Sequence, residues 1–339
     1  MSDFLSNLPA LIVILALVAI LVFTGFRLGI RFVVRRLAGM VFVLLGVTFL
    51  TFILGYFAPS DAIFAQLGQH YTPEAGARLR HLYGLDLPWY QQYLDYLNQL
   101  LHFNLGISYI DDNITVWSVI QRYLPASATL GGVGTVLAII AGVPLGLIAA
   151  VRANTRHDTV IQSLGLVLYA LPSFVIIPFY QVFMVFLHER NLPSLQVSGW
   201  GTIDTEIAPI VIFAAGIFAY YIRITRASML EVLGQDYVRT ARAKGLTEGV
   251  VVRKHAFRNA LIPLLTAIGP ALAFAVVGVF VVEQLFNIPG IGSETIAAAI
   301  SSDFPIVQGT GIILATAIVF MNLITDVAYG FADPRVKSE

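Results

Sequence analysis

The chain of 339 residues is 58% hydrophobic and only 12% charged, with no net charge and no cysteine. Soluble domains carry about twice that fraction of charged residues, so the composition indicates an integral membrane protein. The lack of cysteine excludes disulfides and thiolate chemistry, and the zero net charge gives no general attraction to nucleic acid.

Seven apolar runs are long enough to cross a bilayer, which takes roughly 17–25 residues as a helix. The first run resembles a secretory signal in length, but no basic residue precedes it and a basic cluster follows it. We therefore expect a retained helix there. The fifth run is short, and we expect its outer end to extend into the preceding loop. The runs are 8–23, 37–57, 124–151, 160–187, 207–222, 261–282 and 307–329.

The positions of the basic residues orient these runs, because cytoplasmic loops are enriched in Lys and Arg. With the N-terminus outside, sixteen of the 20 Lys and Arg residues fall on the cytoplasmic side. The opposite topology would place the same sixteen outside. We therefore expect an all-α, multi-pass protein of the plasma (inner) membrane, with seven spans, its N-terminus outside and its C-terminus inside.

The outer loop at 58–123 is long enough to fold. Thr72 is a favourable helix cap before Pro73, and Gly84 is placed to end that helix. A second helix is expected to begin at Pro88, with an aromatic stripe that suits an interfacial belt or a cap as well as a substrate contact. The stripe consists of Tyr90, Tyr93, Tyr96 and Leu97.

Ionisable residues are nearly absent from the interiors of the seven runs. A charge at mid-bilayer costs roughly 2.5–3.5 kcal/mol on insertion scales and is kept where it relays protons or ions, so a proton-driven carrier is disfavoured. Glu283 and Asp326 lie near the ends of runs, and we interpret both as interfacial.

Motifs for chemistry are also missing from the sequence. No Gly-Lys dipeptide, H-E-x-x-H or G-x-S-x-G occurs, and the six histidines are scattered. A P-loop is therefore excluded, and neither a catalytic nor a metal site is predicted. If the protein does driven work, the energy has to come from another subunit.

A polar segment at 228–263 lies on the predicted cytoplasmic side. Gly245 is placed to end a helix in the left-handed conformation, Thr247 can cap the next helix, and Glu248 falls in its first turn. The segment predicts two helices that meet at a sharp corner. Binding to anionic lipid headgroups would explain its basic residues but not this corner. The apolar positions of the first helix are Leu230, Leu233, Tyr237 and Ala241.

This segment resembles the "EAA" loop of the permease subunits of ABC importers, in the form found in the dipeptide/oligopeptide/nickel group. The match rests on DYVRTARAKG at 236–245, with RASMLEVL before it and HAFRNALIP after it. EQLFNIPGIG at 283–292, DPR at 333–335, and YGLD and LGIS in the outer loop fit the first-permease type of the same family. The resemblance extends from Phe32 to the C-terminus.

The resemblance implies an alternating-access importer. A second homologous permease would complete the pathway, two ATPase subunits would supply the energy, and an extracytoplasmic binding protein would deliver the substrate. ATP and Mg would bind to the ATPase partners only, so this chain would be neither an enzyme nor a cofactor-binding protein, and membrane lipid would surround it.

Peptides are the expected substrate, with nickel chelates or another small solute as the alternative within the family. Alternatives outside the family are a self-sufficient secondary carrier or channel, and a structural scaffold without a transport role. An ATPase that co-purifies with the chain would separate the importer from both.

The resemblance also divides the chain. Residues 1–31 would form an extra N-terminal transmembrane helix with a basic linker, because the usual permease has a six-helix core. Residues 32–123 would form the first core helix and the extracytoplasmic loop, and 124–339 the rest of the permease core, with its coupling loop at 228–263.

Two sets of site residues are predicted. The coupling loop would dock in a groove of an ATPase, although Arg239 stands where the general motif has Glu, so no carboxylate contact carries over to that position. The PGIG segment would form an outer gate, with a plain turn as the alternative. The coupling residues are Asp236, Tyr237, Arg239, Thr240, Ala241, Ala243, Lys244 and Gly245, and the gate residues are Pro289, Gly290 and Gly292.

Overall fold

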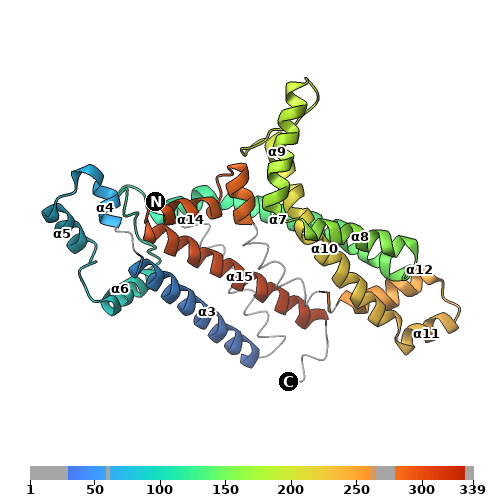
Figure 1. Ribbon diagram of the computed structural model, residues 1–339. Coiled ribbons are helices and arrows are strands. Elements are labelled where there is room, and N and C mark those ends of the chain that lie inside the picture. Colours follow the sequence, from blue (N-terminus) through green and yellow to red (C-terminus); the bar gives the residue numbers. More distant parts are fainter. Residues whose placement is uncertain (1–29, 59–61, 262, 265–278, 333–339) are drawn as a thin grey trace, which may run out of the picture. The chain divides into compact units, whose positions relative to one another are not determined.

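The computed structural model describes residues 30–58, 62–261, 263–264 and 279–332 (Figure 1). Within these residues all the regular elements are helices, and one isolated antiparallel bridge joins Ile107 to Thr115. The predicted first span and most of the predicted sixth span lie outside the described residues. The helices are α3 Ile30–Tyr56, α4 Ala62–Leu67, η1 Gly68–His70, α5 Pro73–Leu82, α6 Trp89–Leu101, α7 Val116–Val151, α8 Arg156–Ala170, α9 Ser173–Glu189, α10 Ile203–Leu233, α11 Asp236–Ala243, α12 Glu248–Val250, η2 Val251–Phe257, α14 Ile291–Ile300 and α15 Phe304–Ala332.

The described residues form two compact units. The described residues of the first unit lie within 1–45, 228–273 and 316–339, and those of the second lie within 46–227 and 274–315. The first unit includes the corner formed by α11, α12 and η2. The second includes the outer-loop helices, most of α7 to α10, and α14.

Four of the described helices are long and apolar enough to cross a membrane, namely α3, α7, α10 and α15. The predicted fourth span, 160–187, is wrong as one continuous helix, because α8 and α9 meet there at 90°. Pro172 has no backbone N–H to continue α8, and it restricts Leu171 to an extended conformation (φ −94°, ψ 106°). Figure 1 shows α9 turning away from α8 at this point.

The predicted fifth span is longer than its apolar run. Helix α10 starts at Ile203, in the preceding loop as expected, and continues to Leu233. The residues after 222 are mostly good helix formers, so the helix persists until Gly234. The single helix predicted through Leu230 and Ala241 is therefore wrong, since Gly234 separates α10 from α11.

Both helices predicted in the outer loop are confirmed. Thr72 caps α5 by accepting a hydrogen bond from the Ala75 N–H at 3.2 Å, and Gly84 follows the helix with φ +67°. In α6, Tyr93 packs on Phe52 of α3 with ring centroids 5.3 Å apart. The aromatic stripe therefore secures the outer loop to α3.

Helices α7 and α10 approach each other closely through glycines of α7. A Cβ on Gly134 would lie 2.5 Å from the Phe213 ring, and one on Gly146 would lie 2.6 Å from the Ile222 carbonyl oxygen. Small residues at these positions let the two backbones pack in contact, as in many membrane helix pairs.

Candidate functional site

The corner after α11 has the geometry that its sequence predicts. Gly245 is left-handed, with φ +78°. Its N–H donates to the Arg242 carbonyl at 2.9 Å, and the Leu246 N–H donates to the Ala241 carbonyl at 3.4 Å. These two bonds form a Schellman motif, which satisfies the last carbonyls of α11 and turns the chain sharply.

An ion pair that the sequence did not reveal closes this corner. The Arg242 guanidinium donates to both carboxylate oxygens of Glu248, at 3.1 and 2.7 Å. The hydrogen bonds from Arg242 lower the pKa of the Glu248 carboxyl below its usual value. Glu248 lies in the first turn of α12 as predicted, whereas the Thr247 side chain makes no capping hydrogen bond. The Arg242–Glu248 pair therefore adds to the backbone hydrogen bonds of the corner, and the Thr247 side chain does not.

The eight predicted coupling residues fall together on this corner, but they do not share one role. Ala241 is buried together with Val238, and α11 contacts η2. Ala241 therefore packs inside the corner and is unavailable to a partner. Arg239 is exposed and makes a long 3.4 Å contact with Asp236. The exposed coupling residues are Asp236, Tyr237, Arg239, Thr240, Ala243, Lys244 and Gly245.

The predicted gate glycines surround a buried carboxylate. Glu283 is fully buried in the second unit, a packing that its interpretation as an interfacial residue did not include. It accepts hydrogen bonds from the Ser127 hydroxyl at 2.6 Å and from the Ser293 N–H at 3.0 Å. Ser127 in turn accepts from the Ile291 N–H at 2.8 Å. The N–H groups of Ile291 and Ser293 have no partner within α14. They are thus bonded to α7 and to helical residues 279–286.

The lack of side chains at Gly290 and Gly292 makes room for Glu283. A Cβ on Gly290 would lie 2.1 Å from the Glu283 carboxyl carbon, and a Cβ on Gly292 would lie 2.8 Å from its Oε2. Pro289 is exposed beside them. Two glycines so close to the start of one helix are a sequence signal that could have indicated a side chain packed against that start.

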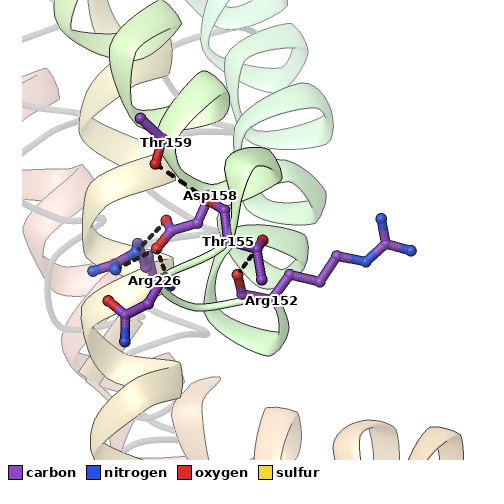
Figure 2. Close-up of polar contacts among 6 residues, drawn as sticks. Arg152, Thr155, Asp158, Thr159 and Arg226 are labelled. Carbon is purple, nitrogen blue, oxygen red and sulfur yellow. Dashed lines mark hydrogen bonds and ion pairs between the residues drawn. The ribbon is translucent and has the colours of Figure 1, made fainter.

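A second ion pair, which is largely buried and which the sequence did not reveal, joins α8 to α10. Figure 2 shows Arg226 facing Asp158, with the Arg152–Thr155 turn beside them. The Arg226 Nε and Nη2 donate to the two Asp158 oxygens, each at 2.7 Å. The Asp158 side chain is 6% exposed. Only the three-dimensional structure brings these two residues together.

Among the residues that the structure describes, no group of three or more His, Asp and Glu side chains could hold a metal ion. The described geometry contains an exposed helical corner, a carboxylate that binds the start of α14, and an ion pair between α8 and α10.

The chain matches known proteins along most of its length. Residues 142–338 match the family described as binding-protein-dependent transport system inner membrane component, and residues 29–131 match the N-terminal region of such membrane components. The chain belongs to this family, and is a multi-pass protein of the plasma membrane.

Several curated relatives cover nearly the whole chain. The dipeptide transport system permease protein DppB of Escherichia coli K12 is 34% identical, over 91% of this chain and 98% of its own. DppB of Lactococcus lactis is 35% identical, over 91% and 99%. A putative peptide transport system permease protein of Brucella abortus is 36% identical, over 90% and 98%.

A solved structure shares the fold. The MetNI methionine ABC transporter, in inward-facing conformations, superposes with a TM-score of 0.51 at 17% identity. The match covers 63% of this chain and 96% of the other. This similarity confirms the permease fold for the part of the chain that it covers.

Proposed function

We propose that this chain is the transmembrane permease subunit of an ATP-driven importer for dipeptides and oligopeptides. The observation that carries the proposal is the 34–36% identity to dipeptide and peptide permeases over 90–91% of the chain. Such a match spans the outer loop, the helices and the cytoplasmic corner together.

The rest of the assembly follows from the family. A second homologous permease completes the pathway, two ATPase subunits bind ATP and Mg, and an extracytoplasmic binding protein brings the peptide. The chain itself crosses the membrane seven times with its N-terminus outside. Residues 1–31 add one helix to a six-helix core, with 32–123 supplying the outer loop and 124–339 the remaining core.

The corner of α11 and α12 is the docking element for an ATPase. Its exposed residues include apolar Tyr237 and Leu246, at 43% and 40% exposure, beside basic Lys244. An exposed helix of this composition suits a groove on a partner subunit. ATP would draw the docked corners together and shift the spans between inward-facing and outward-facing packings, two states of one equilibrium.

Co-purification tests the docking. Ala243→Glu places a bulky charge on the exposed face of α11 without touching its buried side, so we expect the ATPase subunits to be lost from the purified complex. Leu82→Glu, at an outer-loop position that is 71% exposed, is the matched control and should retain them. Retention of the ATPase by Ala243→Glu would exclude this docking surface.

A further inference from the structure

The Asp158 carboxylate accepts hydrogen bonds from helix α10 and from the turn that joins α7 to α8. Besides the two 2.7 Å bonds from Arg226, the Asp158 Oδ2 accepts from the Asn154 N–H at 2.9 Å. Asn154 is left-handed (φ +63°) in the turn that joins α7 to α8. One carboxylate therefore ties this turn to α10. Paired, charge-assisted bonds of this kind are strong and fix geometry as well as distance.

The helices around the pair leave little room for sliding. On α7, a Cβ at Gly146 would lie 2.6 Å from the Ile222 carbonyl oxygen and 2.7 Å from Thr225 Cβ. On α8, a Cβ at Gly165 would lie 3.6 Å from Ala219 Cβ. Helix α10 is thus packed against α7 and α8 within the same few turns that carry Arg226.

Helix α10 also leads directly into the corner proposed to dock on the ATPase. It is continuous from Ile203 to Leu233, and α11 begins at Asp236. Arg226 therefore lies about two helical turns before the end of α10. A displacement of α11 would act on α10 at that end. The Asp158–Arg226 pair is a bidentate polar contact that joins this part of α10 to α8.

We propose that Asp158 and Arg226 are positioning residues that make α7, α8 and the inner part of α10 move as one body. This inference rests on the proposed function, because it concerns how movement of the docked corner reaches the spans. Without the pair, ATP hydrolysis by the partners would continue, while the movement of α10 would no longer be passed fully to α7 and α8.

The first test compares transport with ATP hydrolysis in proteoliposomes that contain the complete complex and its binding protein. Asp158→Asn removes the negative charge of the pair. Arg226→Lys keeps the positive charge but loses the bidentate geometry of the guanidinium donors. We expect peptide uptake per ATP hydrolysed to fall about tenfold for Asp158→Asn and less for Arg226→Lys. Asp86→Asn breaks the exposed His81–Asp86 pair, also 2.7 Å long, and should leave the ratio unchanged.

The second test replaces the ion pair by a covalent bond. The chain has no cysteine, and Cβ atoms at 165 and 219 would lie 3.6 Å apart, which suits a disulfide. Gly165→Cys with Ala219→Cys should restore coupling to Asp158→Asn when oxidised and lose it again on reduction. A merely local effect of Asp158 on stability or charge would not follow the redox state in this way.

Three results would overturn the inference. They are an unchanged uptake-to-ATP ratio in Asp158→Asn, no rescue by the disulfide, and loss of transport when the disulfide forms beside an intact ion pair. The last result would mean that α8 and α10 must separate during transport. A failure of the unmodified complex to take up peptide with ATP would instead count against the proposed function. In that case, the rate at which the 165–219 disulfide forms would still test whether α7, α8 and α10 move together. A rate that changes with ATP would contradict the inference, and a rate independent of ATP would support it.

Discussion

Among the glycines that the structure describes, Gly290 has the least space for a side chain. Alanine there would bring its Cβ to 2.1–2.4 Å from three atoms of the Glu283 carboxylate. We expect Gly290→Ala to lower the free energy of unfolding by about 1–3 kcal/mol, the usual cost of overpacking a rigid site. The shift in the midpoint of thermal unfolding of the purified chain measures this loss of stability.

A double-mutant cycle identifies Glu283 as the cause of that cost. In a Glu283→Ala background the space is vacant, so adding Gly290→Ala should cost almost nothing further. Gly216→Ala, at a helical glycine with no neighbour within 4 Å, is the control and should be neutral or slightly stabilising. Equal costs of Gly290→Ala in the two backgrounds would show that Glu283 does not occupy this space.

Glu248 gives the corner a predictable pH dependence. Because Arg242 lowers the pKa of Glu248 in the folded state, the pair contributes stability above the unfolded pKa of about 4.3. That contribution is lost as the pH falls through the lower folded value. The side chains are 41% and 55% exposed, so we expect less than about 1 kcal/mol.

Hydrogen exchange of the corner amides checks this pH dependence. Protection should decrease between pH 7 and pH 3 in the natural chain, and Glu248→Gln should show the lower protection at both pH values. If the substitution left protection at pH 7 unchanged, the ion pair would not hold the corner.

Local rules found some of these residues and not others. Gly245 was predictable, because a helix end in the left-handed conformation depends on a few neighbouring residues. Glu283 was not, because one of its donors, Ser127, is distant in the sequence and reaches it only through the packing of α7. The same holds for Asp158 and Arg226, whose pairing depends on how α8 packs on α10.

At the scale of helices, the glycines of α7 decide how closely α10 can pack. Gly146 faces the backbone of α10, whereas Gly132 on the same helix has no neighbour within 4 Å. Gly146→Leu should therefore destabilise the isolated chain by about 3 kcal/mol, and Gly132→Leu by no more than about 0.5 kcal/mol. Thermal unfolding of the two variants in detergent measures the difference, and similar midpoints would contradict the close α7–α10 contact.

Apolar runs predicted where helices occur better than where they end or bend. The run at 160–187 is apolar throughout, yet Pro172 splits it into α8 and α9. The polar residues after 222 remain helical in α10, because helix propensity and not hydropathy sets the end of a helix. The contacts between the glycines of α7 and residues of α10 could not be predicted, because the pattern of one apolar run does not show which other helix packs on it.

At the scale of the whole molecule, the chain is a family member, and its described residues include an exposed helical corner and two clusters of polar contacts that join distant segments. In the proposed importer, the exposed α11 corner docks on an ATPase and the Asp158–Arg226 pair couples α10 to its neighbouring helices. The central claim is that the energy for peptide uptake comes from ATPase partners.

Uptake of a labelled dipeptide into proteoliposomes tests this claim most directly. Vesicles containing this chain, its permease partner and both ATPase subunits should accumulate dipeptide only when ATP and the binding protein are present. Vesicles that lack the ATPase subunits should accumulate none. Dipeptide accumulation without the ATPase subunits, or uptake of a nickel chelate in place of dipeptide, would contradict the account.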